Sequence, residues 1–336
     1  MTVLLYQKRR GLFAKSGVGR AMAHQIKALE AAGVKYVLSP NENYDIVHLN
    51  TLDPASKSMA RKAHKQGKKV IFHAHTTIKD FKNSFTLSNV LAEPFKDYLI
   101  KMYQSADLLI TPTPYSKNIL DTYGLGLEIV PISNGIDLKH YAYSEDKVQK
   151  YRDYFKIQPN QKVIISVGYY FERKGFHDFV EIAKALPEYT FIWFGYSSKL
   201  SVTKTIRKAL KNPPTNLILP GYISGDIIEG AWLDSDLFFF PSYEETEGIV
   251  VLEALASKAQ ILLRDIPVYN PWLDDEVHCY KGKDNLDFIE LINQILNGTL
   301  PSTRTKAYEV AETKSIANVG DQLKETYTYL LNKSND

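Results

Sequence analysis

Short apolar runs alternate with longer polar segments of helical period along the first 135 residues. Apolar runs at 3–6, 45–49, 69–75, 107–113 and 127–133 predict buried strands of a parallel sheet. Between the first strands, residues 19–33 and 55–68 carry apolar positions at helical spacing, and Gly33 ends the first of these helices. This alternation predicts a doubly wound α/β domain.

The pattern pauses in a charged, Tyr-rich segment at 138–160 and then starts again. Runs at 162–170, 189–196, 216–222, 236–243 and 260–265 predict a second set of strands, with helices at 176–186 and from about 248. Two doubly wound halves predict a ligand cleft between them. We expect domains at 1–138 and 139–314, and a terminal helix within 315–336 that could pack back on the first domain.

Length and composition narrow the class of protein. A chain of 336 residues is too long for one ordinary core, and contents of 44% hydrophobic and 24% charged residues are typical of globular proteins. The single cysteine, Cys279, excludes an internal disulfide and favours a reducing compartment. The N-terminal MTVLLYQKRRG lacks signal-peptide order, and no apolar run approaches the roughly 18–20 residues of a membrane span. We expect a cytoplasmic protein, peripheral on the inner face of the membrane.

Charge is distributed unevenly between the halves. Residues 1–140 carry 19 Lys/Arg and 11 Asp/Glu, a net +8, and the remainder carries a net −5. The excess predicts an anionic partner for the first half: phospholipid, nucleic acid or an acidic polymer. Residues 78–103 mix Phe, Leu and Tyr with Lys, as expected of a peripheral protein on anionic lipid. Ordinary surface variation would also account for both features. The basic residues of one cluster are Lys57, Arg61, Lys62, Lys65, Lys68 and Lys69.

The stretch YEETEGIVVLEAL (243–255) sets acids against an apolar run. Acids at a helix start, such as Glu244 and Glu247, are favoured by the helix dipole and need no ligand. Glu253 lies inside the apolar run, where a carboxylate needs partners. Gly248 lets the backbone amides at the helix start face an anion. Glu245 and Glu253 could therefore hold sugar or ribose hydroxyls beside a phosphate site.

Two further turns could bind phosphate. Arg173-Lys174-Gly175 follows a predicted strand and precedes a helix, which suits a diphosphate, although such triplets are common on surfaces. Gly17 and Gly19 open the first helix and could approach a phosphate, or form a plain turn. The third glycine of the dinucleotide fingerprint is absent, so NAD binding is poorly supported.

Histidines and acids elsewhere leave alternatives open. His73 and His75 lie on one face at the end of a predicted strand, where they could contact substrate, make structural hydrogen bonds or bind a metal. No nearby cysteine or carboxylate completes a metal ligand set. Asp234-Ser235-Asp236 precedes a buried strand, and we expect it to cap or turn the chain and not to bind a metal.

In order along nearly the whole chain, these motifs resemble retaining glycosyltransferases of family 4, which have the two-Rossmann-domain GT-B fold. The most specific segment is PSYEETEGIVVLEALAS (241–257), which is similar to the family's E-x7-E motif. SGVGR, HAHTT, PISNGID, VGYYFERKG, NLILPGYI and DLFFFPS support it. The EETEGIVVLEALAS segment and the short chain are most similar to those of bacterial glycolipid synthases that make diglycosyl-diacylglycerol.

The resemblance implies an α-hexosyltransferase that moves glucose or galactose from UDP-glucose or UDP-galactose to monoglucosyl-diacylglycerol, without metal or cofactor. Tyr169 stands where many relatives carry Arg, and Arg173 could take that role. By position, the implied catalytic residues are Glu245 and His75; Arg173, Lys174, Gly17, Gly19, Gly248, Ile249 and Val250 would bind the diphosphate, Glu253 the ribose, and Thr246, Glu247 and His73 would line the sugar pocket.

Other functions remain compatible with parts of the sequence. The acceptor could be a capsular, exopolysaccharide or teichoic acid intermediate on the same fold. A nucleotide-sugar binder without transfer activity is a second alternative. A nucleic-acid-binding module would use the basic half but leave Glu245 and Glu253 unexplained, so we expect no nucleic acid partner.

Overall fold

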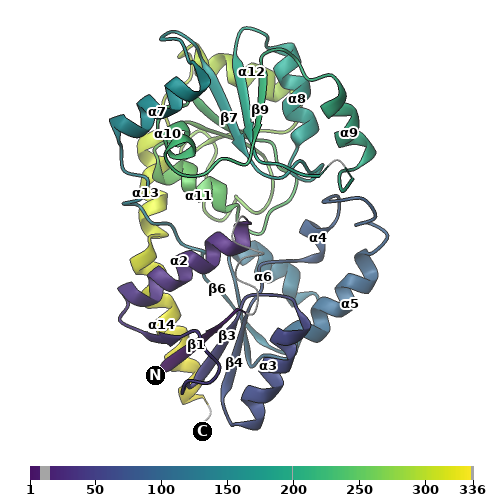
Figure 1. Cartoon of the computed structure of the whole chain (residues 1–336), viewed down its shortest axis with the longest axis vertical. Coiled ribbons are helices and arrows are strands. Elements are labelled where there is room, and N and C mark those ends of the chain that lie inside the picture. Colours follow the sequence, from purple (N-terminus) through teal and green to yellow (C-terminus); the bar gives the residue numbers. More distant parts are fainter. Residues whose placement is uncertain (8–15, 199, 334–336) are drawn as a thin grey trace. The chain divides into compact units, whose positions relative to one another are not determined.

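The computed structural model describes residues 1–7, 16–198 and 200–333 (Figure 1), and the chain divides into two compact units. Unit 1 comprises residues 1–78, 91–137 and 313–336, and unit 2 comprises residues 79–90 and 138–312. The limits expected from the sequence place 79–90 with the first half, whereas the contacts group this segment with unit 2. The last helix belongs to unit 1.

In unit 1 the described residues form a six-stranded parallel sheet of order β2-β1-β3-β4-β5-β6. Each apolar run of the first half forms one strand, and the short edge strand β2 was not predicted because three residues carry no readable period. The strands are β1 (Thr2–Tyr6), β2 (Lys35–Val37), β3 (Ile46–Leu49), β4 (Lys69–His73), β5 (Leu108–Thr111) and β6 (Glu128–Pro131).

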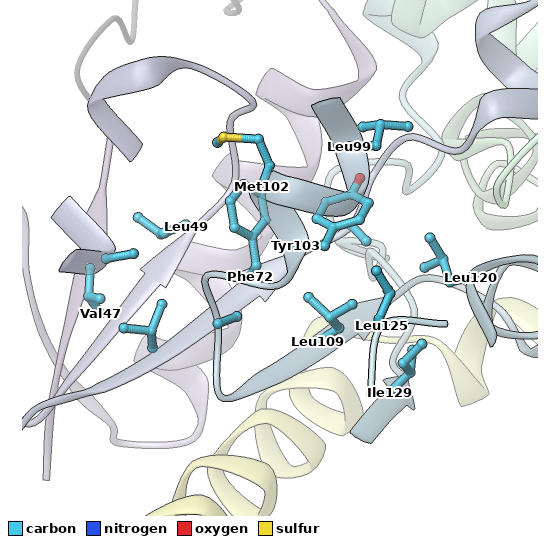
Figure 2. Close-up of a cluster of buried hydrophobic side chains, with 14 of the residues drawn as sticks. Val47, Leu49, Phe72, Leu99, Met102, Tyr103, Leu109, Leu120, Leu125 and Ile129 are labelled. Atoms are coloured by element: carbon cyan, nitrogen blue, oxygen red, sulfur yellow. The ribbon is translucent and has the colours of Figure 1, made fainter. Parts of the chain in front are cut away.

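Helices cover both faces of this sheet, and strand side chains alternate between them. Phe72 and Leu109 point to the cluster under α3 (Pro54–Lys65), α5 (Ala92–Tyr103) and α6 (Pro114–Asp121), which Figure 2 shows. Ile71 and Ile110 point to the opposite cluster, under α2 (Gly17–Ala31) and α14 (Ile316–Asn332). Both faces are therefore apolar, which explains the continuous hydrophobic runs of the strands.

The approach of α14 to α2 depends on a glycine. The two helices lie side by side (Figure 1), and a Cβ on Gly320 would lie 2.2 Å from the backbone oxygen of Ala28. Val319, Leu323 and Tyr327 of α14 complete the cluster against this face of the sheet. Unit 1 is therefore built from both ends of the chain.

Unit 2 repeats the architecture, with a described six-stranded parallel sheet of order β12-β11-β10-β7-β8-β9. The strands are β7 (Val163–Val167), β8 (Thr190–Phe194), β9 (Leu217–Gly221), β10 (Leu237–Phe240), β11 (Ile261–Arg264) and β12 (Tyr280–Gly282). The helices are α7 (Glu145–Phe155), α8 (Phe176–Ala185), α9 (Lys204–Lys211), α10 (Asp226–Asp234), α11 (Ile249–Ala256) and α12 (Asn285–Leu296); α4 (Ile78–Phe81) and α13 (Arg304–Thr313) lie at the unit limits.

The charged, Tyr-rich segment at 138–160 contains a helix. Residues 145–155 form α7, whose N-cap residue Ser144 accepts a hydrogen bond from the amide of Lys147. Only Val148 and Tyr151 of this helix are buried, so its apolar period is too sparse to be read. Within the described residues, no helix is both long and apolar enough to cross a membrane.

Candidate active site

Two turns at the carboxyl edge of the unit 2 sheet meet each other. The first joins β7 to α8 and carries Arg173, Lys174 and Gly175; the second joins β10 to α11 and begins at Pro241. Gly175 has φ +70°, and a Cβ there would lie 2.3 Å from the carbonyl oxygen of Pro241. The amide of Tyr243 donates to the Arg173 carbonyl at 2.7 Å. The contact between the turns therefore requires glycine at 175.

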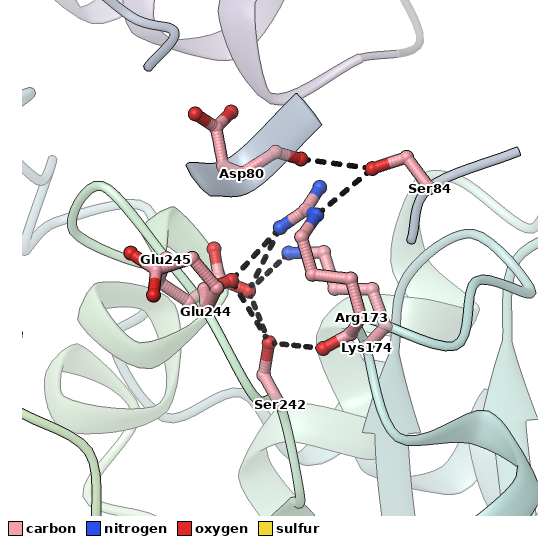
Figure 3. Close-up of polar contacts among 7 residues, drawn as sticks. All are labelled: Asp80, Ser84, Arg173, Lys174, Ser242, Glu244 and Glu245. Carbon is pink, nitrogen blue, oxygen red and sulfur yellow. Dashed lines mark hydrogen bonds and ion pairs between the residues drawn. The ribbon is translucent and has the colours of Figure 1, made fainter. Parts of the chain in front are cut away.

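The meeting of the turns builds a buried ion pair (Figure 3). Glu245 is 6% exposed, and its Oε1 accepts hydrogen bonds from Lys174 Nζ and, at 2.7 Å, from Ser242 Oγ. Arg173 Nη1 lies 3.6 Å from the same oxygen. Within the described residues, every hydrogen bond to this carboxylate reaches Oε1. Oε2 is therefore the oxygen available to a ligand hydroxyl.

Arg173 holds three segments together (Figure 3). Its Nη1 donates to the Glu244 carbonyl at 2.9 Å and its Nε to Ser84 Oγ at 3.1 Å. Its backbone amide donates to the Asn83 carbonyl at 3.1 Å. Because Ser84 and Asn83 belong to the segment 79–90, Arg173 fastens that segment to the loop that carries Glu245.

The charges of the pair depend on each other. Burial acts to raise the pKa of Glu245, but the charges of Lys174 and Arg173 outweigh it, so this pKa lies below its usual range. Burial lowers the pKa of Lys174, and Glu245 offsets this only in part. Removing Glu245 would leave Lys174 and Arg173 without this buried counter-charge, and removing Lys174 would leave Glu245 to the more distant Arg173.

Helix α11 starts beside this pair without a side-chain cap. Its N-cap residue Gly248 has φ +84°, and the half-buried Ile249 and Val250 form the first helical positions. Amides in a first turn have no intrahelical acceptor, and together with the helix dipole they favour an anion. The structure thus brings together the lysine, the arginine and the amides that the sequence assigned to a diphosphate.

Two further acids of this stretch are buried, and Glu244 is half-buried. Glu247 is 0% exposed and Glu253 is 1% exposed, whereas Thr246 is half-buried. The helix dipole, considered as a sufficient explanation for Glu247, does not require this burial. The roles of Thr246, Glu247 and Glu253 toward sugar and ribose stay predictions.

Arg264, at the end of β11, supports the loop from its other side. Its Nε donates to the Pro241 carbonyl at 3.0 Å, its Nη1 to the Lys283 carbonyl at 2.7 Å and its Nη2 to Asp178 at 2.8 Å. Its guanidinium stacks 3.9 Å from the Tyr243 ring centroid. Arg264 was not predicted from the sequence, although an arginine ending the apolar run QILLRD is a charge that must find partners.

Unit 1 carries a separate cluster of histidines. The rings of His73 and His75 stack at 4.1 Å between centroids, and His48 lies 5.5 Å from His73. His75 Nε2 lies 3.0 Å from Asn50 Oδ1. His73 and His75 were predicted to share one face. His48 was not predicted, although its position in the alternating strand β3 puts it on the same side of the sheet.

Burial keeps these histidines neutral. It lowers the pKa of His48 to about 3, with a smaller effect from the charge of His75. It lowers the pKa of His75 to about 4, against an opposing hydrogen bond from Asn134, and it lowers the pKa of His73 well below its usual value. At neutral pH, His75 can offer only a neutral imidazole to a ligand.

Gly17 and Gly19 open helix α2 of unit 1. Its N-cap residue Ser16 accepts a hydrogen bond from the Gly19 amide at 3.2 Å, so this amide already has a partner within the chain. Their predicted phosphate role is not tested by this geometry and stays a prediction.

Among the described residues, no group of three or more His, Cys, Asp or Glu is arranged to hold a metal ion. Asp234 pairs with Arg152 at 2.8 Å, and Asp236 accepts the amide of Val163 at 2.8 Å. Both acids of the Asp-Ser-Asp sequence therefore serve the structure of unit 2.

Comparison with known proteins defines the class to which this fold and site belong. A family profile described as "Glycosyl transferases group 1" matches residues 147–314, and one described as "Glycosyltransferase Family 4" matches residues 37–140. The chain belongs to the glycosyltransferases of group 1 and family 4, which confirms the resemblance found in the sequence.

Two relatives similar to most of the chain are named for glycolipid synthesis. The chain is 46% identical over 328 residues to the processive diacylglycerol alpha-glucosyltransferase of Acholeplasma laidlawii, covering 97% of this chain and 98% of that protein. It is 28% identical over 308 residues to the alpha-galactosylglucosyldiacylglycerol synthase of Streptococcus pneumoniae (strain ATCC BAA-255 / R6), covering 89% and 82%.

Solved structures agree on the fold. Sucrose-phosphate synthase from Thermosynechococcus elongatus superposes with a TM-score of 0.80 at 15% identity, covering 99% of this chain and 100% of that chain. Anabaena Alr3699/HepE in complex with UDP-glucose gives 0.76 at 15% identity, covering 98% and 100%. The predicted GT-B class, with two Rossmann-like doubly wound domains, is confirmed.

Proposed function

We propose that this glycosyltransferase is a retaining α-glucosyltransferase that moves glucose from UDP-glucose to monoglucosyl-diacylglycerol, giving a diglucosyl lipid. The observation that carries the proposal is the buried Lys174–Glu245 pair beside the uncapped start of α11. The choice of glucose and of a lipid acceptor rests on 46% identity along nearly the whole chain to a diacylglycerol glucosyltransferase.

The donor diphosphate is the ligand best matched to the positive groups of unit 2. Lys174, Arg173 and the amides of residues 248–250 offer two cations and a helix start to one anion. When the bond between the anomeric carbon and the β-phosphate oxygen breaks, its electron pair stays on the phosphate. Fixed positive groups stabilise that developing charge, which is work that a metal does in other enzymes, so we propose that no metal or cofactor is needed.

Carboxylates and a neutral histidine suit the sugars of the donor. Glu245 Oε2 would accept a hydroxyl of the transferred glucose, with Thr246 and Glu247 nearby in the same turn, and Glu253 would accept the ribose hydroxyls. His75 of unit 1, neutral at physiological pH, can exchange hydrogen bonds with an uncharged hydroxyl.

Retention of the anomeric configuration is proposed from the α-linkage of the donor and from the name of the Acholeplasma relative. UDP-glucose carries an α-glycosidic bond, and the Acholeplasma relative is named an alpha-glucosyltransferase. An α product requires the acceptor oxygen to bond to the anomeric carbon on the face that the diphosphate leaves. The proton of the acceptor hydroxyl then passes to the departing phosphate oxygen, which balances the step without a protein base.

The acceptor would reach the enzyme at an anionic membrane surface. Basic residues on α3 are exposed, among them Arg61, Lys62 and Lys65. In segment 79–90, Leu87 is 64% exposed and Val90 is 74% exposed, and Lys82 lies near them in the sequence. Exposed apolar residues flanked by cations are typical of proteins that lie on anionic lipid. We therefore propose a peripheral position on the inner face of the cell membrane.

The test is transfer from UDP-glucose or UDP-galactose to vesicles containing monoglucosyl-diacylglycerol, with product mass and linkage determined. We expect an α-linked glucose from UDP-glucose, and a fall of about 100-fold or more in kcat for Glu245→Ala. Glu309→Ala is the matched control, because Glu309 forms an exposed pair with Lys306 on α13. Absence of product from UDP-glucose, or full activity of Glu245→Ala, would contradict the proposal. Transfer only to a polyprenyl-linked acceptor would contradict the glycolipid assignment.

A further inference from the structure

The hydroxyl of Tyr269 is a buried polar group that the proposed mechanism does not yet use. Tyr269 follows β11, is 0% exposed, and packs its ring edge-on against Trp272 at 5.9 Å. In the part of the chain that the structure describes, its hydroxyl has no hydrogen-bond partner. Such a group destabilises the fold, and phenylalanine would fill the same space without that cost. The hydroxyl therefore needs a reason to be there.

Its position points to Glu245. The hydroxyl lies 3.3 Å from the place where a Cβ on Gly248 would stand, and Glu245 Cγ lies 3.8 Å from the same point. The two side chains thus approach the same side of Gly248. Burial raises the pKa of Tyr269 well above its usual value, and the next largest cause is the negative charge of Glu245. At neutral pH the hydroxyl keeps its proton and is a hydrogen-bond donor beside a carboxylate.

One oxygen of Glu245 already has hydrogen-bond donors within unit 2. Glu245 is engaged through Oε1 by Lys174 and Ser242. Under the proposed function, the donor diphosphate binds Lys174 and competes for its charge. A buried carboxylate that loses part of its counter-charge becomes unstable unless another donor takes over. Tyr269 is a donor already in place, and it carries no charge that would compete for the diphosphate.

We propose that Tyr269 is a positioning residue for Glu245, donating a hydrogen bond to its carboxylate when the donor diphosphate occupies Lys174. This inference rests on the proposed function, because it needs a diphosphate at Lys174. The exchange is reversible: when the nucleotide leaves, Lys174 returns to Glu245. No covalent bond changes, and no proton leaves either residue.

The first test compares two variants that each remove only a hydroxyl. Tyr269→Phe is the test, and Tyr151→Phe is its matched control, since Tyr151 on α7 is also buried with a hydroxyl that lacks a partner in the described structure. Both should melt at or slightly above the wild-type temperature without ligand. Only Tyr269→Phe should weaken UDP binding, by about tenfold, as for the loss of a bond to a charged group. It should also move the acid limb of the kcat pH profile to higher pH, because Glu245 in the complex loses a donor that favours its ionised form. A wild-type UDP affinity and pH profile in Tyr269→Phe would overturn the inference.

A double-mutant cycle tests whether Tyr269 acts through Glu245. UDP affinity is measured for wild type, Tyr269→Phe, Glu245→Ala and the double variant, with Glu245→Gln replacing the alanine variant if that one does not fold. We expect the tyrosine change to have less than about a twofold effect once the carboxylate is gone, since coupled residues are not additive. Additive effects would show that the hydroxyl acts independently and would overturn the inference alone. Failure of the wild type to bind UDP would overturn the proposed function as well.

Discussion

Gly175 decides at the scale of one residue whether the two turns of the candidate site can meet. Gly175→Ala combines a φ of +70° with a Cβ placed 2.3 Å from the Pro241 oxygen, so the backbone must move. We expect the free energy of unfolding to fall by about 2–4 kcal/mol, and transfer to fall at least tenfold, because the loop that carries Glu245 shifts. Urea denaturation and the transfer assay measure the two effects.

Gly221→Ala is the control that separates the effect of backbone strain from the effect of the Gly175–Pro241 contact. Gly221 has φ +80° but nothing within 4 Å of the position of a Cβ. Only the left-handed conformation is penalised there, by about 1–2 kcal/mol, and transfer should be unaffected. Equal losses of transfer in both glycine variants would show that the Gly175–Pro241 contact does not position the site.

The positions of site residues were predictable from the sequence where a motif contains them. They were less predictable where they depend on burial by distant parts of the chain. Lys174, Glu245 and Gly248 lie together in unit 2, as their spacing around two strand ends indicated. The burial of Glu247 could not be read from the sequence, because the left-handed Gly248 that follows it is a tertiary feature that no local pattern reveals. Arg264 was missed because its partners come from three separate segments of the chain.

Strand β11 contributes to the site through its last residue. Arg264→Lys keeps a charge near Asp178 but cannot keep the hydrogen bonds to both Pro241 and Lys283 or the stacking on Tyr243. We expect kcat to fall about tenfold at temperatures well below melting, because the β10–α11 loop loses its support on one side. The measurement is kcat and KM for UDP-glucose, with circular dichroism as a check of folding.

Arg152→Lys is the matched control for this element. Arg152 of α7 also pairs with an aspartate of unit 2, Asp234 of α10, at 2.8 Å, but it has no described contact with the β10–α11 loop. Its replacement should leave kcat within about twofold of wild type. If both arginine variants lost kcat equally, general destabilisation would explain the result and the role of β11 would be refuted.

At the scale of elements, the strands were predictable because both faces of each sheet are covered, so every central strand is an unbroken apolar run. The edge strands β2 and β12 have three residues each and carry no period. Helix α7 was hidden by its polar surface. Helix α11 was found through its glycine and acids, since its own residues are almost uniformly apolar.

The stability of the whole molecule should depend on pH through the histidines of unit 1. In the unfolded chain they bind protons near pH 6.5, whereas burial lowers the pKa of His48 to about 3 and that of His75 to about 4. The unfolded state therefore binds more protons below pH 6.5, so stability is full above that value and falls as the pH drops toward 4. At pH 5 we expect a loss of about 2 kcal/mol for each of these two histidines. Urea denaturation between pH 8 and 5 measures it, and His48→Gln should flatten the dependence. An unchanged slope in that variant would contradict this assignment.

Membrane binding is also a property of the whole molecule. Replacing Leu87 and Val90 together by Ser should weaken flotation with anionic vesicles about tenfold or more, because each exposed side chain loses roughly 1–2 kcal/mol of burial in the lipid interface. Leu286→Ser on α12 is the control, since Leu286 is 78% exposed in unit 2 but lies outside the segment 79–90. Equal flotation of both proteins, or no flotation of the wild type at physiological salt, would refute this role for the segment.

The place of α14 in unit 1 sets the order in which the protein can be completed during synthesis. The face of the unit 1 sheet that holds Ile71 and Ile110 is covered in part by residues 316–332, which the ribosome makes only after the whole of unit 2. Until then Val3, Leu5 and Ile71 lack the helix that shields them from water. The sheet that is synthesised first is thus the last to have its apolar face covered. A chain interrupted before residue 313 would expose part of this face to chaperones and to other nascent chains.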